Sequence, residues 1–130
     1  MNDFTVTVGA GSLRSTDPAA VTFPHRWTPE GVSVEADFTG AHLLHLAAAG
    51  CVLNDIYREA AGPGIEITGV QVVATGGFDT SSWHSTGITY AVRIDSPASP
   101  EALATLLATV DEVAEIPRAL RSGAAVTRAR

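Results

Sequence analysis

One stretch of this 130-residue sequence constrains the fold more than any other: AHLLHLAAAGCVLNDIYREA, residues 41–60. It is rich in Leu and Ala, which favour helix, and it ends at the breaker Ala-Gly-Pro-Gly, residues 61–64. Thr39 suits the N-cap position. The first three turns are apolar on almost every side, which predicts a helix buried on most of its surface, within one domain or between subunits.

The residues before this helix predict a β-meander. Residues 4–8 and 32–38 alternate apolar and polar side chains, as a half-buried strand does. Residues 21–27 suggest a strand between them, broken by Pro24.

Two more strands are predicted after the helix, over residues 65–74 and 87–95. The polar, Gly- and Ser-rich connection between them, residues 75–86, is long for a hairpin.

A second helix is predicted from Pro100 to about residue 114, with Ser99 as its N-cap. A short helical turn, residues 117–122, and a closing strand, residues 124–128, complete the chain. The order β-β-β-α-β-β-α-(α)-β predicts one α+β domain over residues 1–130.

Charge and hydropathy exclude several functional classes. The net charge is −6, and all eight basic residues are arginines with no basic cluster, which argues against nucleic-acid binding. No apolar run approaches the length of a membrane span, and the N-terminus lacks a signal-peptide pattern. A single cysteine cannot form an intramolecular disulfide, so we expect a reducing cytoplasm.

Cys51 is the first candidate for chemistry. The thiolate is the reactive form, and an ordinary cysteine pKa of about 8.5 leaves only a few per cent ionised at neutral pH. A nearby arginine would lower the pKa; Arg58 lies two helical turns away on the same face. Asp55, one turn away, would act against ionisation. The alternative is a small buried side chain, which is what most free cysteines are.

His42 and His45 stand three residues apart in the first turns of the helix, a spacing at which two imidazoles can share a metal. His25 and His84 are in or near predicted loops. The alternative is that the helix histidines are hydrogen-bonded without any metal. We expect neither metal nor cofactor.

Three aromatic residues lie in predicted loops or at strand ends: Trp27, Phe78 and Trp83. Such residues often line apolar ligand pockets. The alternative is ordinary packing over the helix ends. The loop of residues 76–86 is long enough to serve as a lid or a partner contact.

The segment FTGAHLLHLAAAGC, residues 38–51, resembles the part of the OsmC/Ohr family in which a cap residue precedes a Leu- and Ala-rich helix ending in Ala-x-x-Cys. Residues 100–120 fit a later family segment, and the similarity covers roughly residues 21–128. The resemblance implies an OsmC-like α+β fold and an intertwined homodimer. Two long helices would pack at its centre, with active sites at the interface.

Family members that are hydroperoxidases use a reactive cysteine with an arginine and a glutamate. By this resemblance Cys51 is the expected nucleophile, and Arg26 (or Arg14) holds its thiolate. His42 takes the place of the glutamate as orienting group or base. The expected substrate-binding residues are His45, Trp27, Trp83 and Phe78.

The chain departs from the family at two positions. The family's resolving cysteine precedes a proline, but here Ile116 precedes Pro117. The family's glutamate position is occupied by Ala41. We therefore expect an external thiol as reductant for organic hydroperoxides or other small electrophiles. The alternatives are a dimeric protein that binds a small hydrophobic ligand without turnover, and a different enzyme on the same scaffold that uses His42 and His45.

Overall fold

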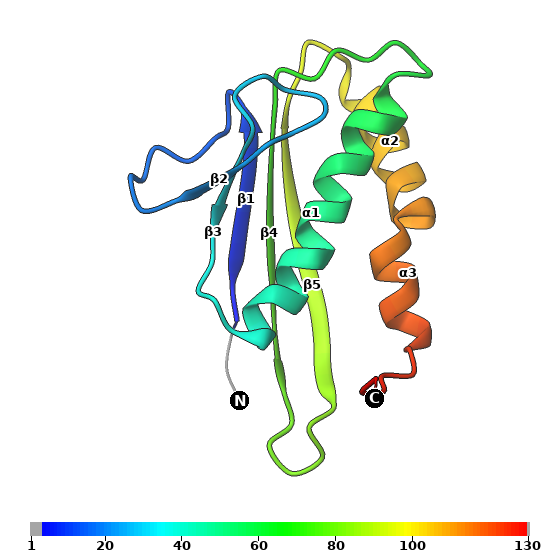
Figure 1. Cartoon of the computed structure of the whole chain (residues 1–130). Helices are drawn as coiled ribbons and strands as arrows, with labels where there is room; N and C mark the ends of the chain where they lie inside the picture. Colours follow the sequence, from blue (N-terminus) through cyan, green and yellow to red (C-terminus); the bar gives the residue numbers. More distant parts are fainter. Residues whose placement is uncertain (1–3, 130) are drawn as a thin grey trace.

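The computed structural model describes residues 4–129, which form one antiparallel five-stranded sheet with three helices on one of its faces (Figure 1). The predicted α+β class is confirmed. The elements in chain order are β1 (Val6–Gly11), β2 (Val21–Phe23), β3 (Val32–Glu35), α1 (Gly40–Ala60), β4 (Gly69–Phe78), β5 (Ser85–Asp95), α2 (Pro100–Val113) and α3 (Glu115–Ser122).

The strand order across the sheet is β2-β3-β1-β4-β5. β1 lies at the centre, where Val8 pairs with Val34 of β3 and with Val72 of β4. Directly opposed residues of neighbouring strands point to the same face. The pairing therefore lines up a row of valines under the helices.

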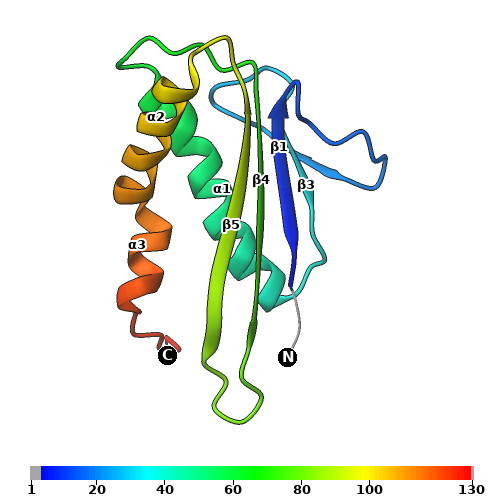
Figure 2. The same cartoon turned by 180° about the vertical axis from the view of Figure 1, so that it is seen from behind.

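The core lies between the sheet and α1. Val8 and Val72 are buried there with Val52 and Ile56 of the helix. Burying a side chain of this kind contributes roughly 1.5–3 kcal/mol. Figure 2 shows that no helix covers the opposite face of the sheet. On the strands this second face carries polar contacts, such as the 2.9 Å hydrogen bond between the hydroxyls of Thr5 and Thr75.

Both predicted helix caps are confirmed. The Thr39 hydroxyl accepts a hydrogen bond from the His42 backbone N–H at 3.1 Å, which satisfies one of the free amides at the start of α1. The Ser99 hydroxyl does the same for Ala102 at the start of α2. The helix predicted over residues 41–60 spans Gly40–Ala60.

α1 is not buried all round within one chain. Its side facing the sheet is closed, but Leu43 and Ala47 on its outer side are exposed. Within a single chain, the helix therefore keeps an uncovered apolar stripe on its outer side. None of the helices in residues 4–129 is long and apolar enough to cross a membrane.

The predicted closing strand over residues 124–128 is wrong. These residues form no strand, and the Val126 side chain is 93% exposed. A strand exists only where a neighbouring strand accepts its hydrogen bonds, and no strand of the described chain pairs with this segment.

Several strand boundaries also differ from the prediction. The second strand ends at Phe23 rather than residue 27, because Pro24 has no N–H to donate to the sheet. β4 begins at Gly69 rather than residue 65, and β4 and β5 continue toward each other to Phe78 and Ser85. The long connection predicted there is therefore a hairpin that extends beyond the other elements (Figure 1).

Candidate functional site

Cys51 lies midway along α1 and is partly buried. It lines a cavity of about 730 Å³, here called the Cys51 cavity, between the outer side of α1, the loop from β2 to β3, and the start of α3. The lining is largely apolar and includes Phe23, Trp27, Leu46 and Ile116. A reactive group that opens into an apolar cavity is the usual arrangement of a small-molecule site.

The surroundings of Cys51 favour the neutral thiol. Burial is the main cause that raises the pKa of Cys51, and the negative charges of Asp55 and Glu115 raise it further. The backbone amides of Ile116 and Glu115, at the start of α3, face the sulfur and act in the opposite direction. The predicted action of Asp55 against ionisation is thus confirmed in direction.

A charged network surrounds the sulfur and joins α1 to α3. The Cys51 Sγ lies 3.9 Å from Asp55 Oδ2, which in turn lies 3.2 Å from Arg58 Nη2. The same Arg58 nitrogen lies 3.1 Å from Glu115 Oε1, and Arg58 Nε lies 3.1 Å from Glu59. Arg58 therefore neutralises the carboxylates around the thiol rather than binding the sulfur itself.

Cys51, Asp55 and Glu115 place three possible metal ligands within 4.8 Å of one another. The Arg58 guanidinium already bridges the two carboxylates. A metal ion there would have to compete with this built-in positive charge, so the arrangement fits an ion-pair network better than a metal centre.

The loop between β2 and β3 forms the wall of the Cys51 cavity and is tied to α1 through His25. The His25 Nε2 lies 3.0 Å from Asn54 Oδ1, and its Nδ1 lies 2.7 Å from the Thr28 hydroxyl. The ring also meets Tyr57 edge-on at 5.3 Å. Burial lowers the pKa of His25, partly offset by the hydrogen bond that its ring donates to the Asn54 amide oxygen.

Besides Cys51, two of the predicted site residues, Arg26 and Trp27, line the Cys51 cavity. The Arg26 guanidinium lies over the Trp27 ring, 5.8 Å from its centre, in a cation–π contact. Arg14, the other candidate arginine, lies in the loop after β1 and does not line this cavity.

His42 and His45 lie at the other end of α1, away from the Cys51 cavity. His45 is fully buried, and its Nδ1 donates to the Ala41 carbonyl at 2.7 Å. The His42 Nδ1 lies 2.7 Å from the Thr39 hydroxyl. Because nine residues of helix separate His42 from Cys51, the two are about 13 Å apart along the axis.

Neither histidine belongs to a group of three possible metal ligands within residues 4–129. The geometry therefore lends no support to the alternative enzyme built on His42 and His45.

Phe78 and Trp83, the aromatic residues of the β4–β5 hairpin, do not line the Cys51 cavity. Phe78 packs against Phe4 at 5.9 Å and His45 at 6.3 Å. Trp83, 70% exposed, lies in the turn of the β4–β5 hairpin with a left-handed φ of 61°. Asp79 shapes this turn by accepting hydrogen bonds from the following serines, which lowers the pKa of Asp79 to about 2.

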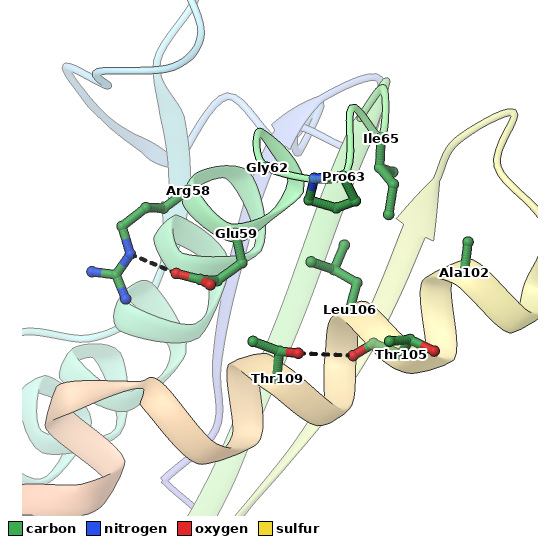
Figure 3. Close-up of a pocket in the computed structure, with 9 residues that line it drawn as sticks. All are labelled: Arg58, Glu59, Gly62, Pro63, Ile65, Ala102, Thr105, Leu106 and Thr109. Atoms are coloured by element: carbon green, nitrogen blue, oxygen red, sulfur yellow. Dashed lines mark hydrogen bonds and ion pairs between the residues drawn. The ribbon is translucent and has the colours of Figure 1, made fainter.

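Arg58 and Glu59 also border a second hollow of about 590 Å³, between the end of α1 and α2 (Figure 3). Its floor includes Leu106, and Thr105 and Thr109 line the α2 side. Arg58 thus lies between two hollows and is 42% exposed.

Sequence reasoning missed Glu115 and Asn54. Glu115 contacts Arg58, a residue 57 positions earlier in the chain. A signal for Glu115 existed, since it stands just before the Ile116-Pro117 pair that replaces the resolving cysteine. Asn54, one turn after Cys51, carried no comparable signal.

The family model described as OsmC-like protein matches residues 32–128. The chain belongs to the OsmC-like family. Its fold is similar to that of an OsmC-like protein from Mycoplasma pneumoniae, with a TM-score of 0.59 and 16% identity over 71% of this chain and 79% of that one.

A second solved OsmC-like structure is the hydroperoxide resistance protein from Jannaschia sp. CCS1. It has a TM-score of 0.53 and 14% identity over 95% of this chain and 90% of that one. No protein of curated function matches the chain by sequence. At these identities the two structures establish the OsmC-like fold, and function has to be argued from the site.

Proposed function

We propose that this chain is an OsmC-like homodimer in which Cys51 reduces organic hydroperoxides or other small electrophiles, with an external thiol as reductant. The observation that carries the proposal is the partly exposed Cys51 in an apolar cavity of about 730 Å³. The solved OsmC-like protein from Jannaschia is described as a hydroperoxide resistance protein, which supports this substrate class.

The reaction follows the chemistry of an activated cysteine. The Cys51 sulfur attacks the terminal oxygen of the hydroperoxide, so an S–O bond forms and the O–O bond breaks. The products are a sulfenic acid and an alcohol. Two external thiols then restore Cys51, giving one disulfide and one water. Ile116 supplies no resolving sulfur, so the sulfenic acid waits for the external thiol.

Arg26 is the proposed partner of the thiolate and the substrate. It lines the Cys51 cavity, and its position over Trp27 holds the guanidinium at the cavity wall. Its positive charge would stabilise the thiolate against the burial that raises the pKa of Cys51.

The proposed dimer follows from the apolar outer side of α1. Leu43 and Ala47 are exposed there, and Phe23 and Trp27 are exposed nearby on the cavity wall. A second copy that packs on this side would cover the stripe and close the Cys51 cavity.

The test follows Cys51 by intact mass after an organic hydroperoxide is added to purified protein, beside a Cys51→Ser control. We expect a rapid gain of one oxygen in the unaltered chain only, reversed by added thiol. A reaction no faster than that of a free cysteine would rule out the peroxidase.

The second candidate is a protein that binds a small hydrophobic ligand in the Cys51 cavity without turnover. It is favoured by the raised pKa of Cys51, because a neutral thiol is a poor nucleophile. In that case an apolar fluorescent probe should bind the unaltered chain and Cys51→Ser equally, and hydroperoxide should leave the mass of both unchanged.

A further inference from the structure

Asp55 is the side chain that contacts the Cys51 sulfur in the described chain, at 3.9 Å from Oδ2. It lies four residues after Cys51 on the same face of α1, and only 5% of its side chain is exposed. Resting on the proposed function, we propose that Asp55 is a catalytic proton shuttle, which accepts the thiol proton of Cys51 and delivers it to the leaving alkoxide.

Neither of the two positions that the resemblance suggested for this role can serve it. Ala41 occupies the position of the family's glutamate, and His42 lies about 13 Å along the helix from the sulfur. Glu115 also lies within 4.8 Å of the sulfur, but Asp55 is the acid for which the described chain shows a hydrogen bond with the thiol.

Arg58 fixes the Asp55 carboxylate in the required position. Its Nη2 lies 3.2 Å from the same Oδ2 atom that faces the sulfur. Glu59 and Glu115, each at 3.1 Å, hold the guanidinium in turn. A carboxylate held by a second group in this way needs no rearrangement to receive a proton.

The charged groups that face this site come from three elements. Asp55, Arg58 and Glu59 lie on α1, Glu115 lies on α3, and Arg26 lies on the loop between β2 and β3. Burial raises the pKa of Asp55, and the Arg58 charge opposes it. A carboxylate with a raised pKa is a stronger base than an exposed one, which suits it to carry the thiol proton during the reaction.

The Cys51 proton passes to Asp55 Oδ2 as the sulfur bonds to the terminal peroxide oxygen. The O–O bond breaks, and the departing alkoxide takes the proton from Asp55. Sulfur is oxidised to the sulfenic acid, the peroxide is reduced to the alcohol, and Asp55 returns to its carboxylate form.

Two reagents separate this role from a purely electrostatic one. Alkylation by iodoacetamide needs only the thiolate, because iodide leaves without a proton. Oxidation by a hydroperoxide also needs a proton for the alkoxide. In Asp55→Asn the negative charge that raises the pKa of Cys51 is gone, so alkylation should be as fast as in the unaltered chain or faster. Oxidation should fall about a hundredfold or more.

Glu112→Gln, at an exposed position of α2, is the matched control. It also removes one carboxylate, but Glu112 is not among the groups that act on Cys51 or on Asp55. Both reactions should proceed in it at the rates of the unaltered chain.

Three results would overturn the shuttle: unchanged oxidation in Asp55→Asn, oxidation and alkylation that fall together there, or an equal fall of oxidation in Glu112→Gln. If Asp55→Asn does not fold, the unaltered chain still decides the matter through the solvent deuterium isotope effect. The shuttle requires a larger effect on oxidation than on alkylation, and equal effects exclude it. If the unaltered chain does not react with the hydroperoxide, both the proposed function and the shuttle are ruled out.

Discussion

The two halves of α1 place their polar side chains in different settings. Near its start, His45 is fully buried between the helix and the β4–β5 hairpin, where it stacks on Phe4 and meets Phe78 edge-on. Farther along, Cys51 and Asp55 lie beside a cavity and a network of charges. We call these the closed half and the open half.

The two halves differ in the access that they give to these side chains. An imidazole packed among aromatic rings stabilises the fold but has no space for a substrate. A thiol at a cavity, with a carboxylate at 3.9 Å and amides of another helix facing it, has space, a group that can accept its proton and donors that stabilise its thiolate. A cavity and charged partners beside a side chain are therefore a better guide to its reactivity than its position on the same helix.

The largest expected effect tests whether the open half is covered by a second copy. Ala47 is exposed on a single chain, so Ala47→Glu should change the unfolding free energy of a monomer by no more than about 0.5 kcal/mol. In the proposed dimer the same carboxylate would be buried without a partner, costing about 3–5 kcal/mol of association.

Sedimentation velocity would then show a dimer for the unaltered chain and a monomer for Ala47→Glu. Ala104→Glu, on an exposed position of α2, is the control and should remain a dimer. A dimer that tolerates Ala47→Glu equally well would mean that this face stays uncovered.

The second prediction concerns the closed half alone, where a substitution should lower the stability of the fold. A Cβ added at Gly76 would lie 2.2 Å from the Gly87 carbonyl oxygen and 2.6 Å from His45 Nε2. Because backbone on one side and a buried ring on the other cannot yield easily, Gly76→Ala should lower the free energy of unfolding by about 3 kcal/mol.

Urea denaturation measures this loss. A Cβ added at Gly62 meets nothing within 4 Å, so Gly62→Ala is the control. It should leave the urea midpoint unchanged or slightly higher. A Gly76→Ala protein as stable as Gly62→Ala would show that the closed half is looser than its contacts indicate.

The smallest expected effect is a pH dependence of stability, caused by His25 in the cavity wall beside the open half. Burial lowers the pKa of His25 in the folded chain below its unfolded value, which is about 6.5. The unfolded chain therefore binds the proton more readily, so this contribution to stability is present above pH 6.5 and is lost as the pH falls below it.

Thermal unfolding between pH 7.5 and 5.5 should show a fall in stability that is shallower in His25→Gln. His84, in the exposed hairpin turn, supplies the matched control His84→Gln, which should keep the slope of the unaltered chain. Identical slopes in all three proteins would contradict the assignment to His25.

Features set by neighbouring residues could be predicted from the sequence. The bounds of α1 and the caps at Thr39 and Ser99 follow from helix propensity and from hydroxyls placed to accept the first free amides. The strand predicted over residues 124–128 was wrong because an alternating pattern does not say whether a pairing partner exists. The hairpin was longer than predicted because Gly76 and the residues after it continue the pairing through a bulge.

The residues of the candidate site also fall into those that the sequence could suggest and those that it could not. Cys51 could be proposed as the only thiol, and the resemblance directed attention to Arg26. The contacts of Glu115 with Arg58 and of His25 with Asn54 join distant segments, so no local pattern reveals them. His42 and His45 attracted attention through their spacing, but packing separates them from the thiol.

The pairing of β5 has a consequence for handling the protein. This 11-residue strand ends the sheet, and in residues 4–129 it pairs only with β4. Its outer edge therefore offers unpaired N–H and C=O groups to any extended chain that approaches, which is the usual start of edge-to-edge aggregation. Arg93 and Asp95 place charges near one end of that edge. Toward Ser85 it carries no charge, so concentrated samples should first self-associate there.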